Sequence, residues 1–385
     1  MLKFNLIAPC HFGLESVLKK EITDLGYDIK EVSDGRVAFE GDGDAVARAN
    51  TFLRTPERIL IEVGGFRAET FDELFEGIRA LEWEKFIPKD GRFWVTKAAS
   101  VNSRLFSPSD IQSIVKKAVV ERLKPVYGMR YFEETGEDYP IRIFIKKDLV
   151  TAALDTTGVS LHKRGYRQVQ GEAPIAENLA ASLLMLTPWK ADRSFVDPFC
   201  GSGTFPIEAA MIAAGIAPGL NRHFTSENWP KVVPPKLWLD VREEARDMIR
   251  MDVSCDIQGY DIDAAVLSKA RQNAAMAGVD QMIHFQRRPL SDLSHHGKYG
   301  FVVTNPPYGQ RMEEEELPQL YRQIGEAMDR LPTWSFYLIT AYGDAERMIG
   351  RRAAKNRKIY NGMIKTYYYQ FPGPKPPRRP MRKED

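Results

Sequence analysis

The chain has 385 residues, of which 43% are hydrophobic and 28% are charged. This is the balance of an ordinary globular protein, and it excludes wholesale disorder because the apolar content is sufficient for more than one core. The best uncharged apolar run, residues 180–186, falls far short of the roughly 18 residues that a membrane span needs. The length predicts two or three domains and no membrane partner.

Charge gives more information through its distribution than through its sum. Lys and Arg total 54 against 52 Asp and Glu, a net charge of +2 that points to no particular partner. Five cations gather in residues 351–358, and more lie among the prolines of residues 372–385. Such clusters are typical of a surface that meets a polyanion, although solvated surface gives the same pattern. We expect the basic, Pro/Arg-rich tail at 372–385 to be disordered.

The three cysteines, Cys10, Cys200 and Cys255, form no Cys-x-x-Cys pair. Neither a disulfide framework nor a zinc cluster is therefore indicated, and we expect no metal. The apolar stretch at residues 6–10 is too short for the apolar part of an export signal and is predicted to be a first β-strand. In the absence of an export signal, a cytoplasmic location is expected.

Residues 1–165 are predicted to be α+β, with short strands alternating with amphipathic helices. Apolar residues at helical spacing between Gly13 and Gly26 predict the first helix, and Asp34-Gly35 predicts a hairpin turn within residues 27–39. Residues 107–110 offer caps for a later helix. Further helices are predicted at 44–53, 71–81 and 109–123, and strands at 58–63, 93–98, 141–145 and 149–154.

From residue 166 onward the pattern becomes a regular alternation of strands and helices. Such alternation predicts a mostly parallel sheet covered on both faces, with ligands at the carboxyl ends of the strands. Asn361-Gly362 predicts a closing hairpin between strands at 358–360 and 366–371. The other strands are expected at 194–197, 256–260, 283–286, 300–304 and 335–340, and the helices at 173–186, 206–214, 264–277, 317–331 and 344–349.

A glycine-rich turn follows the first strand of this alternation. Asp197 ends the strand, and Gly201 and Gly203 let a ligand approach the backbone closely before the next helix begins. A dinucleotide-binding loop would have a third glycine where this chain has Pro206, which disfavours a nicotinamide cofactor. The turn also lacks the Gly-Lys-Ser/Thr ending of a P-loop. A nucleotide-type ligand is the functional interpretation, and a tight structural turn is the alternative.

An acidic side chain stands at the tip of the second strand. Asp261 is placed where a carboxylate grips the two hydroxyls of a ribose. Asp263, two residues later, suits a helix cap equally well.

The fourth strand breaks into Asn305-Pro306-Pro307-Tyr308. The prolines make this loop rigid, and because they lack backbone N–H groups, their backbone contributes only carbonyl acceptors. An Asn oxygen and a proline carbonyl can together accept both hydrogens of an exocyclic amine, while a Tyr ring stacks on a planar base. Two acceptors stabilise the positive charge that develops on an aromatic amine during attack on an electrophile.

Three features follow one another along the chain: the glycine-rich turn, the acid at the tip of the second strand, and Asn-Pro-Pro-Tyr after the fourth strand. In this order they resemble the S-adenosylmethionine-dependent methyltransferases that act on amino groups. The longer stretch 197–204, with 161–167 and 11–15, resembles the THUMP-domain RNA methyltransferase family. Within that family the chain is most similar to the N-terminal half of the bifunctional bacterial enzymes that methylate guanine N2 in 23S ribosomal RNA.

The resemblance implies a fold and a division into domains. It implies a ferredoxin-like region at 1–60 and a THUMP RNA-binding domain at 61–165, together an α+β region. It further implies a Rossmann-like class I methyltransferase domain at 166–371, an α/β domain with a mostly parallel sheet, ahead of the tail at 372–385. The second methyltransferase half of the bifunctional enzymes has no counterpart in these residues.

The resemblance also assigns cofactor-binding residues. Asp197, Gly201 and Gly203 would line the methionine end of S-adenosylmethionine, and Asp261 would hold its ribose. Asn178 would contact the cofactor from the segment before the first strand, which closes over it.

The target amine would be held by Asn305, Pro306 and Tyr308 as the catalytic residues. Where the family often has an acid for the adenine amine, this chain has Pro289, so Asp292 is the substitute candidate.

Three basic residues before the methyltransferase domain, Lys163, Arg164 and Arg167, are candidates to bind RNA phosphates, or else form a solvated linker face. The resemblance implies methyl transfer to the N2 amine of a guanosine in 23S ribosomal RNA. The same chemistry on transfer RNA is the nearest alternative, and an RNA-binding protein with an inactive methyltransferase domain is another. A THUMP region reads RNA shape, so no motif identifies the nucleotide, and none identifies the oligomeric state.

Overall fold

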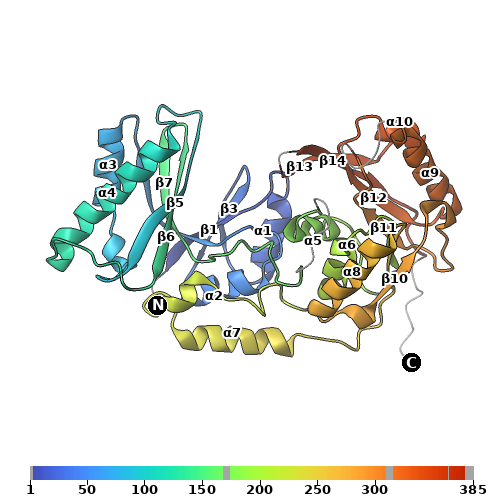
Figure 1. Ribbon diagram of the computed structural model, residues 1–385, viewed down its shortest axis with the longest axis horizontal. Coiled ribbons are helices and arrows are strands. Elements are labelled where there is room, and N and C mark those ends of the chain that lie inside the picture. The colour runs from blue at the N-terminus through green and yellow to red at the C-terminus, as the bar shows by residue number, and fades with distance from the viewer. Residues whose placement is uncertain (1–2, 168–173, 309–314, 363, 378–385) are drawn as a thin grey trace, which may run out of the picture. The chain divides into compact units, whose positions relative to one another are not determined.

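The computed structural model describes residues 3–167, 174–308, 315–362 and 364–377, and the residues group into two compact units (Figure 1). One unit contains Met1–Cys10, Leu14–Leu161 and Ala217–Asp247, and the other contains His11–Gly13, His162–Ile216 and Met248–Asp385. We call them the N-terminal unit and the C-terminal unit. Most of the basic tail, residues 378–385, lies outside the described residues.

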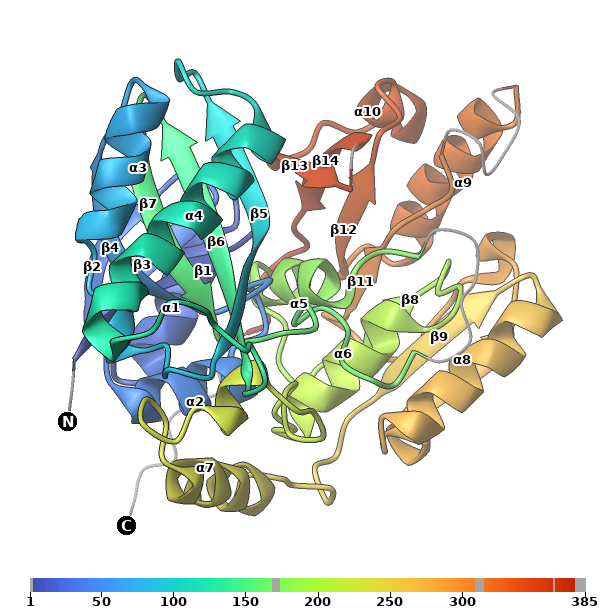
Figure 2. The same cartoon turned by 60° about the vertical axis from the view of Figure 1, so that its left-hand side comes forward.

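The described strands of the N-terminal unit form one seven-stranded sheet with the order β2-β3-β1-β4-β7-β6-β5, in which only β5 and β6 pair in parallel. Helices α3 and α4 pack against each other, and α4 packs along β5 (Figure 2). The predicted α+β class is confirmed. The elements are β1 Phe4–Pro9, α1 Glu15–Asp24, β2 Ile29–Ser33, β3 Arg36–Gly41, α2 Gly43–Phe52, β4 Leu60–Arg67, α3 Phe71–Ala80, β5 Arg92–Val101, α4 Pro108–Tyr127, β6 Asp138–Lys146 and β7 Leu149–Asp155.

Local signals explain where these helices begin and end. Thr70 and Glu73 form a reciprocal capping box at the start of α3. Helix α4 begins with Pro108 in its first turn and ends at Gly128, which adopts the left-handed conformation with φ 63°. The predicted side-chain cap is wrong at Ser107, which occupies the cap position but makes no capping hydrogen bond.

The segment Ala217–Asp247, which includes helix α7 (Pro235–Asp247), belongs to the N-terminal unit, although it interrupts the chain of the other unit. Figures 1 and 2 show α7 beside α2, against which it packs. Trp229 is 1% exposed, stacks on Tyr139 with ring centroids 4.8 Å apart, and donates from Nε1 to the Asp138 carbonyl at 2.8 Å. Burial of such aromatic area makes the segment part of this core. The insertion lies inside the range 166–371, where the sequence did not reveal it.

The C-terminal unit is a doubly wound α/β structure, as predicted. Its sheet has the order β10-β9-β8-β11-β12-β14-β13; the strands from β10 to β12 are parallel, and β13 and β14 form the predicted antiparallel hairpin. The elements are α5 Glu177–Met185, β8 Phe195–Asp197, α6 Thr204–Ala213, β9 Ile257–Asp261, α8 Ala264–Met276, β10 Ile283–Arg287, β11 Phe301–Thr304, α9 Leu317–Arg330, β12 Ser335–Thr340, α10 Ala345–Ile349, β13 Lys355–Asn361 and β14 Ile364–Phe371.

Helices cover both faces of this sheet. Helices α9 and α10 share a core with one face, in which Tyr321 and Leu338 are fully buried. Helices α6 and α8 pack against each other and against β9 and β10. Because the carboxyl ends of parallel strands open at one edge, the loops after β8, β9, β10 and β11 converge there. Among the described helices, none has the length and apolar character required to cross a membrane.

Candidate functional site

A cavity of about 810 Å³ lies at this edge of the sheet of the C-terminal unit. Its lining comes from the segments that follow β8, β9, β10 and β11, including Gly201, Asp261, Ser291 and Asn305. A smaller cavity of about 90 Å³ shares Gly201 and Asn305 with it and adds Asp197. The structure thus brings together residues that lie about a hundred positions apart in the chain, as a topological switch point predicts.

Asp197 is a buried carboxyl group, 1% exposed, at the end of β8. Its Oδ1 accepts hydrogen bonds from the Thr304 hydroxyl at 2.5 Å and from the Phe199 backbone N–H at 3.1 Å. Burial nevertheless raises the pKa of Asp197 to about 7, since the desolvation of the charged form outweighs these bonds. The nearby Asp261 carboxylate acts in the same direction.

The Asp261 carboxylate is fixed by two backbone donors. Gly201 donates to Oδ2 and Asp263 donates to Oδ1, each at 3.0 Å. Gly201 adopts the left-handed conformation with φ 53°, which glycine tolerates better than other residues. Asp263 caps α8 by accepting from the Ala265 N–H at 2.8 Å, and it also lines the larger cavity. A carboxylate held in this way is preorganised for a pair of hydroxyl donors.

Gly203 has a packing role in addition to its place in the turn. It has φ 88° at the start of α6, and a Cβ there would lie 3.1 Å from Ala270 Cβ and 3.1 Å from the Phe285 ring. Among the described residues that line the two cavities, Gly203 is absent. Close approach of α8 and β10 therefore accounts for this glycine, and its predicted contact with a cofactor stays a prediction.

The loop after β11 places Asn305 between the two cavities. Asn305 is 9% exposed, and its Oδ1 is buried and accepts no hydrogen bond from the described residues. Pro307 lines the larger cavity, whereas Pro306 is buried outside the lining. Tyr308 is 6% exposed, and its hydroxyl accepts a hydrogen bond from Asn361 Nδ2 at 3.1 Å. An unsatisfied buried carbonyl oxygen is costly, so its presence at a cavity indicates a place for a donor.

Two of the predicted cofactor contacts lie outside the cavity linings. Asn178 is fully buried in α5, and its Oδ1 accepts from the Leu179 N–H, whereas Pro174 and Ile175 of the same segment line the smaller cavity. Asp292 is exposed and accepts from the Ser291 hydroxyl at 3.0 Å. From that turn, the lining contains Pro289, Leu290 and Ser291 instead. The roles of Asn178 and Asp292 remain predictions.

The structure gives Arg164 a different role from the one predicted. Its side chain is 1% exposed and its Nε lies 3.5 Å from Glu208 Oε1, which also accepts from the Tyr166 hydroxyl at 3.0 Å. A guanidinium group buried in this way cannot reach an RNA phosphate, so the prediction is wrong for Arg164. A glutamate in the otherwise apolar helix α6 was the available signal, because a buried carboxylate requires a partner.

Arg167 is likewise part of the interior of the unit. Its Nη2 donates to the Thr204 hydroxyl at 2.7 Å and to the Ile175 carbonyl at 3.0 Å, and its Nη1 lies 3.4 Å from the Glu177 carboxylate. Both Thr204 and Ile175 line the smaller cavity. The predicted contact of Arg167 with RNA is therefore replaced by a contact that shapes this cavity. Lys163 is exposed, and its role stays a prediction.

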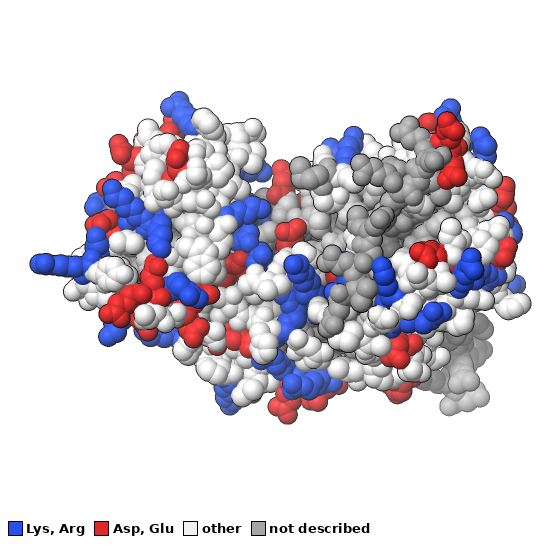
Figure 3. Space-filling view, viewed as in Figure 1, with Lys and Arg blue, Asp and Glu red and all other residues white. Residues whose placement is uncertain are grey.

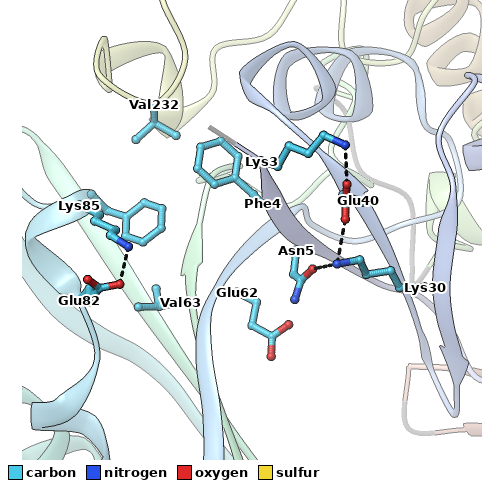
Figure 4. A pocket seen from close by; sticks show the side chains of 11 residues that line it. Lys3, Phe4, Asn5, Lys30, Glu40, Glu62, Val63, Glu82, Lys85 and Val232 are labelled. Atoms are coloured by element: carbon cyan, nitrogen blue, oxygen red, sulfur yellow. Dashed lines mark hydrogen bonds and ion pairs between the residues drawn. The ribbon is translucent and has the colours of Figure 1, made fainter. Parts of the chain in front are cut away.

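The N-terminal unit has a cavity of its own, of about 300 Å³ (Figure 4). Lys3 and Lys30 both pair with Glu40, at 2.7 and 3.0 Å, and Lys85 pairs with Glu82. The charges of these three lysines are thus compensated locally, and the cavity contains no described constellation that suits catalysis.

Three family models match the chain. Residues 164–370 match the RMKL-like methyltransferase domain, residues 5–60 match the RlmL ferredoxin-like domain, and residues 68–155 match the THUMP domain.

Relatives and solved structures agree with these matches. YpsC of Bacillus subtilis, named as an RNA methyltransferase, is 47% identical over 96% of each chain. The ribosomal RNA large subunit methyltransferase K/L of Cellvibrio japonicus is 34% identical over 94% of this chain, which spans about half the length of that relative. A methylase structure from Clostridium difficile has a TM-score of 0.94 at 48% identity over 98% of this chain and 100% of that one. SMU.472, solved in complex with SAH, has a TM-score of 0.92 at 42% identity over 98% and 100%.

Proposed function

The chain belongs to the RMKL-like methyltransferase family, and on that basis we propose that it transfers a methyl group from S-adenosylmethionine to the exocyclic N2 amine of a guanosine in 23S ribosomal RNA. The RNA substrate is supported by the THUMP match and by the names of YpsC and of the K/L relatives, and the cofactor by the SAH complex of SMU.472. The three cysteines are all free, as is usual in the cytoplasm, where we propose that the enzyme acts.

The observation that carries the amine as target is the buried Oδ1 of Asn305. It accepts no hydrogen bond from the described residues, and it lines both cavities. An exocyclic amine would supply the missing donor at this atom.

The chain's own residues suit the cofactor. Asp261 is preorganised for the ribose hydroxyls by its two backbone donors. The buried Asp197 carboxyl in the smaller cavity suits the ammonium group of the methionine portion. The turn at Pro289–Ser291 lines the larger cavity, where it would face the adenine. When bound, S-adenosylmethionine supplies an electrophilic methyl group on its sulfonium sulfur.

The same loop would orient the target base. Asn305 Oδ1 and a proline carbonyl accept the amine hydrogens, which stabilises the positive charge that grows on nitrogen during attack. Tyr308 is 6% exposed and is absent from both cavity linings, so stacking of the base on its ring stays a prediction. The base must leave its own stack to enter the loop, at a cost of a few kcal/mol. No side chain has to remove a proton before attack, because the acidity of the amine rises as it is methylated.

The role of Asn305 is tested by Asn305→Ala. We expect kcat to fall about 100-fold or more while the Kd of S-adenosylmethionine changes little, because the interaction strengthens only as charge develops. Single-turnover methyl transfer and calorimetric titration of the cofactor measure the two quantities. Turnover at the wild-type rate in this variant would remove the proposed role.

The substrate is tested by incubating the protein with labelled S-adenosylmethionine and either unmodified ribosomal RNA or bulk transfer RNA. After digestion to nucleosides, we expect the label in N2-methylguanosine from ribosomal RNA. Label in N2-methylguanosine from transfer RNA would support the proposed reaction but show that transfer RNA is the substrate. A Listeria monocytogenes structure, 48% identical over 97% of each chain with a TM-score of 0.91, is named as an N6-adenine-specific DNA methylase, so double-stranded DNA is included as a third substrate.

A further inference from the structure

The hairpin of β13 and β14 presents a checkerboard of cations and aromatic rings. Lys358 pairs across the hairpin with Tyr367, and Tyr360 pairs with Lys365. Because side chains alternate between the faces of a strand, these four lie on one face. Lys358 Nζ lies 5.2 Å from the centroid of the Tyr360 ring, and Lys365 Nζ lies 5.2 Å from that of Tyr367. We call this set the hairpin checkerboard.

The hairpin checkerboard is accessible and its charge is uncompensated. Lys358, Lys365 and Tyr360 are exposed, the tyrosine to 37%. Neither lysine forms an ion pair with a carboxylate of the described residues, unlike Arg351 just before the hairpin, which pairs with Asp329. β12 pairs with β14 only over residues 367–371, so the checkerboard extends beyond that pairing.

The hairpin reaches the candidate active site. At the end of β13, Asn361 donates from Nδ2 to the hydroxyl of Tyr308, in the loop that holds the target amine. Asn361 directly follows Tyr360 but alternates to the other face of β13, so the contact with the base-binding loop adjoins the checkerboard along the strand without lying on its face. On the same strand, Arg357 points to other partners and donates to the Gly13 carbonyl at 2.6 Å.

We propose that the hairpin checkerboard binds the single-stranded RNA that flanks the target nucleotide, with phosphates at Lys358 and Lys365 and a neighbouring base stacked on Tyr360. The inference rests on the proposed function in one respect, namely that the substrate is RNA. Alternating cations and flat aromatic faces are what single-stranded nucleic acid requires, since backbone charge and base faces recur together along it. Lysine on an outer strand also hinders strand pairing between molecules, and that role needs no neighbouring tyrosine.

The test compares three variants: Lys358→Gln with Lys365→Gln, Tyr360→Leu, and Lys355→Gln. Lys355 is an exposed lysine on the same strand but on the opposite face, so it is the matched control. The probe is a fluorescein-labelled single-stranded RNA of about 16 nucleotides, the upper range of such sites, titrated by anisotropy at several salt concentrations. Thermal melting verifies that each variant is folded.

We expect the double lysine variant to bind the probe about tenfold more weakly, with a salt slope that is smaller by about 1.4, the value for two lost phosphate contacts on a single strand. Tyr360→Leu should weaken binding about tenfold with the salt slope unchanged, because stacking releases no counterions. Lys355→Gln should behave as wild type. The proposal would be overturned if all three variants bound the probe as wild type does. It would also be overturned if the wild-type protein did not bind the probe.

Parallel assays of cofactor binding and methyl transfer separate this inference from the proposed function. Weaker probe binding by the checkerboard variants, in a protein that forms no N2-methylguanosine, would support the hairpin contact and reject the reaction. Unchanged probe binding by the checkerboard variants, together with normal N2-methylguanosine formation, would reject the hairpin contact and support the reaction. Where both hold, the checkerboard variants should raise the KM for ribosomal RNA and leave the Kd of S-adenosylmethionine unchanged.

Discussion

The charge of the Asp197 carboxyl group depends on pH in the neutral range because of its buried environment. It is buried with two hydrogen-bond donors on one oxygen, and burial raises its pKa to about 7. Near neutral pH the unliganded chain therefore contains protonated and ionised Asp197 in comparable amounts. A cation bound in the smaller cavity would stabilise the ionised form and lower this pKa.

Cofactor affinity should consequently depend on pH. Since only ionised Asp197 pairs with an ammonium group, binding of S-adenosylmethionine should tighten as the pH rises from about 6 to about 8, by at most about tenfold for each unit of pH. Calorimetric titration of the unliganded protein across this range measures the effect. In Asp197→Asn the affinity should be weaker and the dependence absent, and a flat profile in the wild type would contradict the assignment.

The same group should lower the stability of the unliganded protein at high pH. The folded pKa is raised from 3.8 to about 7, so between these values the folded state binds the proton that the unfolded state has lost, and stability falls as the pH rises. Asp197→Asn should therefore be the more stable protein at about pH 8, by a few kcal/mol at most, given about 1.4 kcal/mol per pKa unit. Urea unfolding at several pH values tests this, with Asp263→Asn as the exposed control; equal stability of Asp197→Asn and wild type would argue against it.

At the scale of elements, Arg167 connects the segment before α5 to the start of α6. It donates to the Ile175 carbonyl and to the Thr204 hydroxyl, and pairs with Glu177. In Arg167→Gln the buried Glu177 loses its partner, which typically costs about 3–5 kcal/mol, and the wall of the smaller cavity loses two hydrogen bonds.

Restoring charge balance with Arg167→Gln and Glu177→Gln together should recover most of that stability, because neither group is then charged. The affinity for S-adenosylmethionine should stay about tenfold or more below wild type, because the bonds to Ile175 and Thr204 remain lost. Thermal melting and calorimetry separate the two effects. If the double variant bound the cofactor as wild type does, Arg167 would be a purely structural ion-pair partner.

The elements that the sequence predicts well are those with a strong period. The strand at 256–260 is observed at Ile257–Asp261, and the helix at 317–331 at Leu317–Arg330. The acids and amide at the strand tips could also be predicted, because parallel topology brings the carboxyl ends of the strands to one edge. The pairing of Arg164 with Glu208 could not, because the lone glutamate of apolar helix α6 indicates a buried carboxylate but not which cation pairs with it.

At the scale of the whole molecule, positive and negative charges nearly balance. The net charge is +2, and on the face drawn in Figure 3 positive and negative side chains are interspersed among the described residues. With so small a net charge, long-range attraction of RNA by the overall charge is weak, and we expect affinity to come from local clusters of cations. The hairpin checkerboard is such a cluster, and its effect should be visible above a nearly neutral background.

The segment Ala217–Asp247 shows why sequence alone did not predict the division into units. Helix α7 has an apolar stripe, with Trp238, Val241 and Ala245 buried, and any amphipathic helix shows as much. The stripe does not say which core it covers. Here the partner, which includes α2 and β6, lies far earlier in the chain.

The N-terminal unit should therefore not fold well as residues 1–161 alone. Without Ala217–Asp247 it loses the buried side chains of Trp229, Val233 and Trp238, and each lost tryptophan alone typically costs about 3–5 kcal/mol against a total stability of about 5–15 kcal/mol. A fragment in which residues 217–247 follow residue 161 through a flexible linker should instead show a cooperative urea transition, with a midpoint well above that of 1–161. The same fragment with Trp229→Ala and Trp238→Ala provides the matched control and should lose that gain. If residues 1–161 alone unfolded at the same urea midpoint as the linked fragment, residues 217–247 would pack on the N-terminal core without contributing to its stability.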